Sequence, residues 1–442
     1  MRSVPWSLGM AAAVLMAVGL TAPRLAGQST GASHVPSTAS AENGPNSMQA
    51  QSQHYVVLVS LDGFRWDYAR RDGAAHLLTL GKQGAWAPEG MLPSFPALAL
   101  PNQFTIVTGL YPEHHGLVGG SFYDPERKAR FDAADAKNAA DGSWYGGVPL
   151  WSLAESEGMR AAVIGWPGAE AKIAGFRPSL SAGSSGKLSE TQQVEQVLKW
   201  LRLPEAERPH FIAVNFQEPG LEATKFGPDA AQTKAAVLRM DALIGKLQAG
   251  LDATGLPINL VVVSDRGLAK PDGGWITLDA YTSLKGFETD GPLLYGPTEP
   301  ERQRVYRQIN HVSSLFVAYR LRNVPAELHG SINPRMGDPV VIPTGPYAIR
   351  AQGPTAGQPD EAPPAGIDGL DPNEQPEMKA IFFAAGPDIL PGKTVAPFEN
   401  VNLYPWMAHM LGLKTPKSDG SPNILSGTLR DDGGEADSGA KQ

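Results

Sequence analysis

Short apolar runs alternate with helical patterns between residues 54 and 425. The strand-like runs are rich in β-branched residues and apolar on both faces: Tyr55–Leu61, Ala161–Ile164, His210–Phe216, Ile258–Ser264 and Lys379–Ala384. The stretches between them carry the period of amphipathic helices. Because strands that are apolar on both faces need cover on both sides, the pattern predicts an α/β fold with a mainly parallel sheet between two helical layers.

Three helices are well marked. The first begins at Ser189, and Gln192 three residues later completes a capping box. Its apolar face is formed by Val194, Val197, Leu198 and Leu201. The other two are expected at 229–251 and 401–411. Residues 270–350 are rich in Pro and Gly and lack periodicity, which predicts a small inserted lid region.

The N-terminal segment has the features of an export signal. Arg2 precedes an apolar run from Met10 to Leu20, and small residues follow at Ala26-Gly27. This predicts a signal peptide at 1–27 and a periplasmic or secreted protein. The alternative is an uncleaved anchor, but the run is shorter than the ~20 residues that span a bilayer. No other segment predicts a membrane span after signal cleavage.

The polar segments at both ends bound the folded domain. Residues 28–53 are rich in Ser, Ala, Gly and Gln and predict a disordered linker, and residues 426–442 predict a disordered tail. The domain is therefore expected at 54–425.

The charge and cysteine content of the chain exclude several functions. The full chain of 442 residues has 37 basic and 45 acidic residues, a net charge of −8, which argues against nucleic-acid binding. The absence of cysteine excludes disulfides, cysteine-bound zinc and a thiol nucleophile.

Two aspartates follow two of the predicted strands. Asp62 comes directly after Tyr55–Leu61, and Asp265 directly after Ile258–Ser264. Ligands bind beyond the carboxyl ends of parallel strands, so the pair suggests a metal site; the alternative is that each Asp caps the turn that follows it. None of the nine histidines directly follows a strand, and HExxH, GxSxG and GxxxxGK[ST] motifs are absent. The pair His114-His115 is interpreted as part of a turn.

Several motifs resemble those of one family, in order and over nearly all of residues 54–425. The segment VSLDGFR at 59–65 is similar to the first metal-ligand motif of the nucleotide pyrophosphatase/phosphodiesterases, in the alkaline phosphatase superfamily. PNQF at 101–104 and IVTGLYPE at 106–113 resemble the family's nucleophile helix and the loop after it. Further matches are Trp166-Pro167-Gly168, Glu218-Pro219, Phe226-Gly227-Pro228 and Ser264-Asp265.

The resemblance implies an alkaline-phosphatase-like α/β/α sandwich and a phosphodiesterase with two zinc ions. In the family, three His and three Asp hold the metals, a Thr attacks phosphorus and forms a covalent intermediate, and an Asn donor supports the developing charge. Carried over residue by residue, two ligands are kept, as Asp62 and Asp265. The Thr falls on Ala99, the Asn on Gly120 and the base-stacking aromatic on Leu100; the remaining ligands fall on Gly220, Thr224, Arg266 and Asp368.

These substitutions predict a degenerate site. Alanine has no hydroxyl, and Thr105, six residues further on, is too far along a regular helix to replace it. We expect no cofactor, and we expect Arg266 to lie between Asp62 and Asp265 in place of the second metal. The predicted function is an exported pseudoenzyme that binds an unidentified ligand or protein partner in the ancestral cleft. The alternatives are an active hydrolase using one Mg²⁺ or Ca²⁺ at Asp62, Asp265 and Asp368, or a purely structural role.

Overall fold

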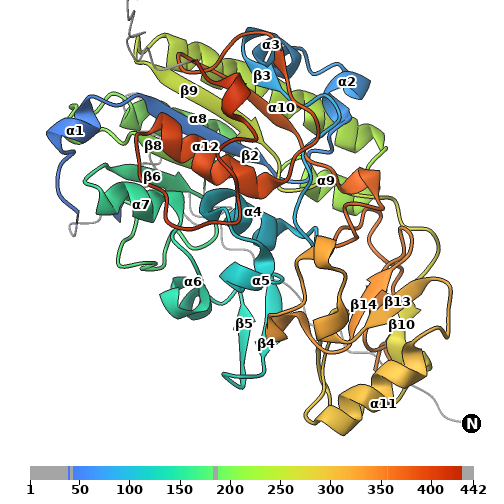
Figure 1. The fold of residues 1–442 in the computed structure, drawn as a ribbon. Coiled ribbons are helices and arrows are strands. Elements are labelled where there is room, and N and C mark those ends of the chain that lie inside the picture. The colour runs from blue at the N-terminus through green and yellow to red at the C-terminus, as the bar shows by residue number, and fades with distance from the viewer. Residues whose placement is uncertain (1–37, 40–42, 183–187, 356, 431–442) are drawn as a thin grey trace, which may run out of the picture. The chain divides into compact units, whose positions relative to one another are not determined.

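A nine-stranded sheet forms the centre of the molecule (Figure 1). The computed structural model describes residues 38–39, 43–182, 188–355 and 357–430. The strands in spatial order are β1 (Thr38–Ala39), β7 (Leu180–Ser181), β6 (Ala161–Ile164), β8 (Phe211–Phe216), β2 (Tyr55–Leu61), β9 (Ile258–Val263), β16 (Phe382–Ala385), β3 (Ala85–Trp86) and β17 (Lys393–Thr394). The expected signal peptide lies outside the described residues.

The middle of the sheet is parallel, and its exceptions lie toward the edges. β6, β8, β2 and β9 run parallel to one another, whereas β16 pairs with β9 antiparallel, with Phe382 opposite Val263. The prediction of a mainly parallel sheet is thereby confirmed. β16 begins three residues later than predicted because Lys379 and Ala380 bond instead to the backbone N–H groups of Trp66 and Met91.

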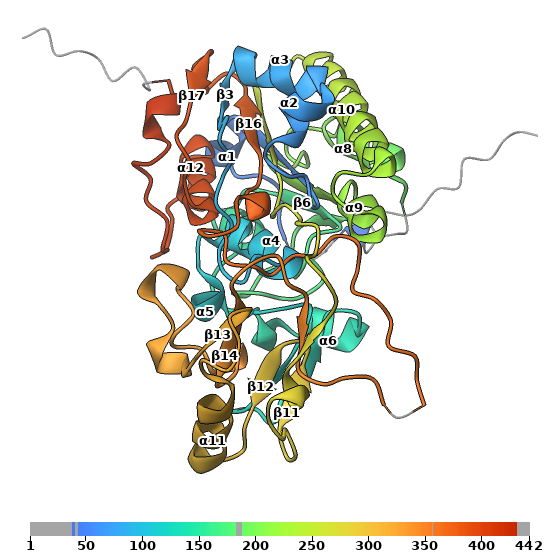
Figure 2. The same cartoon turned by 90° about the vertical axis from the view of Figure 1, so that its right-hand side faces the viewer.

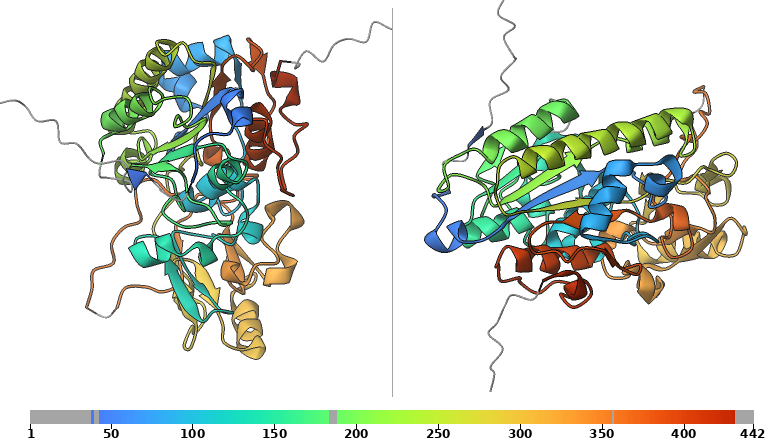
Figure 3. Two further views of the ribbon diagram at one scale, coloured as in Figure 1. Left: turned by 90° about the vertical axis from the view of Figure 1, so that its left-hand side faces the viewer. Right: turned by 90° about the horizontal axis from the view of Figure 1, so that it is seen from above.

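Helices cover both faces of the sheet, as the right-hand view of Figure 3 shows for α8, α10 and α12. Alternate residues of β2 explain the two layers: Val56 and Leu58 face one core, and Val57 and Val59 face the other. The first core contains α4 (Ala99–Thr108), α7 (Leu150–Ser156) and α12 (Leu403–Met410). The second contains α2 (Tyr68–Asp72), α3 (Ala75–Gln83), α8 (Glu190–Trp200) and α10 (Ala231–Asp252).

The capping box predicted at Ser189 is present. The Ser189 side chain accepts from the backbone N–H of Gln192, and the Gln192 side chain accepts from the backbone N–H of Ser189.

Within the part of the chain that the structure describes, none of the helices has the length and apolar character that crossing a membrane requires. The remaining short helices are α1 (Met48–Gln51), α5 (Pro112–His115), α6 (Ala136–Ala140) and α9 (Gly220–Phe226).

Residues 270–350 form a small unit with a core of its own, seen below the large sheet in Figure 2. It contains α11 (Glu299–Ile309) and the strand pairs β10–β15 (Ile276–Thr277, Ile349–Arg350), β11–β12 (Glu288–Asp290, Leu293–Tyr295) and β13–β14 (Phe316–Tyr319, Val340–Pro343). The hairpin β4–β5 (Ser121–Asp124, Ala129–Asp132) is joined to this unit, since the Ser121 hydroxyl donates to Asp290 at 2.7 Å. This region is therefore more regular than its sequence pattern suggests.

The described residues next to both ends of the chain are bonded to the folded body. Residues 43–53 belong to the folded body because Asn46 bonds through its side chain to the carbonyl groups of Glu205 and Arg208, at 2.8 and 2.7 Å. Near the other end, the Thr428 carbonyl accepts the N–H of Leu390. Both segments are polar and have no apolar period. Hydrogen bonds to or between backbone groups attach them to the folded body.

Candidate functional site

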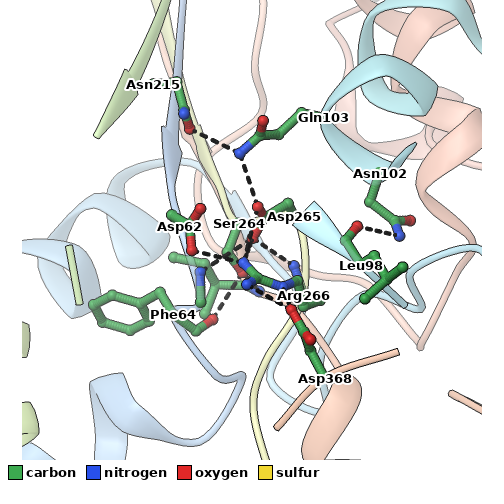
Figure 4. Close-up of polar contacts among 12 residues, drawn as sticks. Asp62, Phe64, Leu98, Asn102, Gln103, Asn215, Ser264, Asp265, Arg266 and Asp368 are labelled. Atoms are coloured by element: carbon green, nitrogen blue, oxygen red, sulfur yellow. Dashed lines mark hydrogen bonds and ion pairs between the residues drawn. The ribbon is translucent and has the colours of Figure 1, made fainter. Parts of the chain in front are cut away.

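The carboxyl ends of β2 and β9 bring the two predicted aspartates together. The strands pair in parallel register, with Ser60 opposite Val263, and Asp62 and Asp265 each lie two residues further along. Asp368, from the segment that follows the inserted unit, reaches the same place (Figure 4). Parallel strand geometry brings Asp62 and Asp265 together at the carboxyl ends of β2 and β9, and Asp368 joins them there from a loop.

The guanidinium of Arg266 lies among these three carboxylates (Figure 4). Its Nη1 donates to Asp62 Oδ1 at 2.6 Å and to both oxygens of Asp265 at 3.0 and 3.1 Å. Its Nε and Nη2 lie 2.9 and 2.8 Å from Asp368 Oδ2. The Arg266 side chain is only 7% exposed, so these partners replace water almost completely.

Asp265 is the most enclosed member of this cluster. Its side chain is fully buried and accepts the backbone N–H groups of Gly63 and Arg266, at 3.1 and 2.8 Å. Gln103, on α4, donates to Asp265 Oδ2 at 2.9 Å. These neutral donors stabilise the carboxylate in addition to the guanidinium. Gln103 and Gly63 are site residues that the sequence does not single out, although both lie inside the motifs VSLDGFR and PNQF.

Burial and charge shift the titration of the cluster. Burial raises the pKa of Asp62 to about 7, aided by the negative charge of Asp265, although Arg266 acts in the opposite direction. The surrounding carboxylates, led by Asp265, hold the pKa of Arg266 well above its usual value in spite of burial. Three carboxylates around one guanidinium leave an excess of negative charge. Protonation of one carboxyl lowers this excess, which agrees with the raised pKa of Asp62.

Gly220 and Asp62 share one space. The Gly220 N–H donates to the Asp62 carbonyl at 2.8 Å, and a Cβ at Gly220 would collide with the Asp62 carboxylate. The position that the resemblance assigns to a third Asp ligand is thus filled by the side chain of the first. By contrast, a Cβ at Gly120 would meet no atom within 4 Å.

The position predicted for the nucleophile offers no hydroxyl. Ala99 is the first residue of α4. Thr105 is fully buried and its hydroxyl lies 3.0 Å from His115 Nε2, and the Thr108 hydroxyl donates to the Phe104 carbonyl. Both hydroxyls are engaged in these bonds, and neither bond reaches the carboxylate cluster.

The histidine pair serves the fold. His115 is buried, and this burial lowers its pKa to about 3, so it is neutral at physiological pH. His114 Nδ1 lies 2.7 Å from Asp419 Oδ2, on the loop after α12. The two rings lie in α5, a four-residue helix, in place of the simple turn that the sequence predicts.

The donor set does not fit two zinc ions. A zinc site takes three or four ligands that are His, Cys or carboxylate, and three of the six predicted ligand positions hold Gly, Thr and Arg, which do not bind zinc. The guanidinium of Arg266 also lies where a cation would have to contact Asp62 and Asp265. No group of three or more metal-ligating side chains suited to an ion occurs in residues 43–182, 188–355 and 357–430.

Comparison with known proteins gives consistent matches. A family model described as type I phosphodiesterase / nucleotide pyrophosphatase matches residues 56–369. An uncharacterised pyrophosphatase/phosphodiesterase of Schizosaccharomyces pombe is 31% identical over 397 residues, which cover 86% of this chain and 80% of the relative. Ectonucleotide pyrophosphatase/phosphodiesterase family member 1 of Rattus norvegicus is 29% identical over 394 residues, but the match spans only 42% of that relative and 85% of this chain.

A solved structure resembles the whole domain. An inactive Thr-to-Ala form of murine ectonucleotide pyrophosphatase/phosphodiesterase 5, in complex with AMP, has a TM-score of 0.79 and 25% identity. The match covers 86% of this chain and 100% of that one.

Proposed function

We propose a function from one established premise: this chain belongs to the type I phosphodiesterase/nucleotide pyrophosphatase family. The predicted family resemblance and the alkaline-phosphatase-like α/β/α fold are both confirmed. The proposal is that the chain no longer hydrolyses phosphodiesters and instead binds a ligand in the cleft beside Asp368.

The position of the Arg266 side chain is the observation that carries this proposal. Its guanidinium neutralises Asp62 and Asp265, the two retained ligand positions, from inside the cluster. A guanidinium has no vacant coordination position, so it cannot act as a Lewis acid toward phosphate or lower the pKa of a bound water as a metal does. With Ala99 at the start of α4, the site also lacks an attacking oxygen.

The solved neighbour supports the proposal by analogy. Its inactive form carries a Thr-to-Ala change, which is the type of replacement that the family resemblance assigns to Ala99, and it still holds AMP. Loss of the nucleophile is thus compatible with ligand binding in this fold. Because Arg266 lies between Asp62 and Asp265, we also propose no resident cofactor for this chain.

The direct test is hydrolysis of a chromogenic phosphodiester such as bis(p-nitrophenyl) phosphate. We expect no turnover above the buffer rate with Zn²⁺, Mg²⁺, Mn²⁺ or Ca²⁺ added. Elemental analysis of the purified protein should find no stoichiometric zinc. Metal-dependent turnover that Asp62→Asn abolishes would overturn the proposal and establish the alternative, a hydrolase with a single hard cation at Asp62, Asp265 and Asp368.

We also propose that the protein is exported, to the periplasm or beyond the cell. The support is the predicted signal at 1–27 together with relatives that are named ectonucleotide enzymes and venom phosphodiesterases. Cell fractionation followed by N-terminal sequencing tests it. We expect a mature N-terminus close to residue 28, and an uncleaved chain in the cytoplasm would contradict the proposal.

A further inference from the structure

A cavity of about 740 Å³ opens beside the carboxylate cluster. Three of the degenerate positions, Gly120, Thr224 and Asp368, line it. Most of its remaining walls are apolar and come from the loop before α4, the loop between α5 and β4, the inserted unit and the segment before Asp368: Leu98, Val118, Trp275, Val340, Tyr347 and Ile367. A cavity of this size and lining suits a small organic ligand with an apolar body.

The charged groups on this cavity are all of one sign. Asp132, Asp290 and Asp368 line it, and among its described lining residues there is no Lys, Arg or His. Asp368 belongs to the cluster in which one guanidinium serves three carboxylates. A phosphate group placed there would face carboxylates and no lining cation, which is the opposite of what phosphoester recognition requires.

The nearby arginines do not cancel this charge. Arg130 pairs with Asp290 at 3.2 Å and with Glu288 at 2.7 Å, so this group also keeps an excess carboxylate. The carboxylate of Asp132 accepts the backbone N–H of Ala134 and has no arginine or lysine partner within the described part of the chain. Arg350 lies over the Trp275 ring, but its charge is already paired with the Asp360 carboxylate at 2.7 Å.

We propose that this cavity binds an apolar organic cation, such as an alkylammonium compound, in preference to an anionic phosphoester. The inference rests on the proposed function, because it assumes a cleft that binds without cleaving. The apolar walls hold the body of the ligand, and the carboxylates attract its charged end.

The test compares two probes that share one tail. Octyltrimethylammonium and octyl phosphate are titrated separately into the full chain by isothermal calorimetry at low ionic strength, below their micelle concentrations. We expect the cation to bind at least about tenfold more tightly than the anion, with the difference shrinking as salt is added. Equal affinities, preference for octyl phosphate, or no binding of either probe would overturn the inference.

Three variants place the binding in this cavity. Gly120→Phe adds bulk where no atom obstructs a Cβ and should reduce affinity for the cation at least about tenfold, whereas unchanged affinity would overturn the inference. If that variant does not fold, Asp132→Asn and Asp135→Asn decide the question. Both aspartates accept local backbone N–H bonds, but only Asp132 lines the cavity, so only Asp132→Asn should weaken binding.

Failure of the proposed function gives a different result from failure of this inference. Metal-dependent turnover of bis(p-nitrophenyl) phosphate would overturn the proposed function, whichever probe binds more tightly. A preference for octyl phosphate in a protein without that turnover would overturn only the present inference.

Discussion

Two buried polar networks meet α4 on neighbouring residues, and they are balanced in different ways. At Asn102, the side-chain oxygen accepts the backbone N–H of Ser94 and the amide of Asn400, at 2.7 and 2.8 Å. Its amide nitrogen donates to three carbonyl groups, those of Ser94, Pro96 and Leu98, at 2.9–3.1 Å. Every group in this network is neutral and satisfied.

The second network begins one residue later, at Gln103, and is charged. Gln103 donates to Asp265, which shares Arg266 with Asp62 and Asp368. This network has more carboxylates than cations. The two networks therefore differ in charge balance: the neutral one pairs its donors and acceptors without any ionised group, whereas the charged one leaves an excess of carboxylate around a single guanidinium.

The largest effect is expected from Arg266→Met, which keeps the bulk of the side chain and removes its charge. It leaves three carboxylates facing one another, so the free energy of unfolding should fall by about 3–5 kcal/mol at pH 7.5. Urea denaturation measures it. Arg239→Met, at an exposed ion pair of 3.7 Å with Glu218, is the matched control and should cost less than about 1 kcal/mol. Similar losses of unfolding free energy in both variants would contradict the excess of carboxylate charge around Arg266.

A smaller loss is expected from Asn102→Ala in the neutral network. It leaves the Ser94 N–H and the Asn400 amide without their acceptor, which should cost about 2–3 kcal/mol. Since no ionised group takes part, the loss should be the same at pH 5 and pH 8. The loss in Arg266→Met should shrink at pH 5, because protonated carboxyls no longer repel. A pH-dependent loss in Asn102→Ala would remove the distinction between the networks.

The space at Gly220 can be tested against the space at Gly120. A Cβ at Gly220 displaces the Asp62 carboxylate from Arg266, so Gly220→Ala should cost about 1–3 kcal/mol. Gly120→Ala meets open space and should change stability by less than about 1 kcal/mol. Thermal melting of both variants gives the comparison, and equal melting temperatures would show that the Asp62 side chain moves freely.

The last test measures how the stability of Asp62→Asn changes with pH. The folded protein keeps a proton on Asp62 up to about pH 7, whereas the unfolded chain loses it near pH 4. The folded state therefore binds more protons between these values, and stability should fall as pH rises through this window, by at most about 1.4 kcal/mol per unit. Asp62→Asn should flatten this slope, although Glu155, whose pKa burial raises to about 6, will leave part of it. An unchanged slope would contradict the assignment.

The sequence predicts the central strands well because they are long and apolar on both faces. Tyr55–Leu61 and Ala161–Ile164 have the predicted bounds, and the capping box at Ser189 marks the start of α8 correctly. The edge strands β3 and β17 are two residues long and carry no periodicity. The antiparallel direction of β16 is likewise set by tertiary pairing and not by its own residues.

For the site, the sequence indicates which residues follow the strands but not how their charges are shared. The convergence of Asp62 and Asp265 follows from parallel strand ends. The contribution of Gln103 does not, because its amide reaches Asp265 only once α4 has packed across the sheet edge. The overlap between Gly220 and the Asp62 side chain is equally invisible in the sequence, since it depends on a rotamer.

That overlap has a consequence for rebuilding a metal site in this chain. An aspartate introduced at 220 would collide with the Asp62 carboxylate, and a histidine introduced at 266 would remove the charge that holds the neighbouring acids together. Each of these replacements is therefore expected to be harmful when it is made alone, and a metal site would require several of them at once.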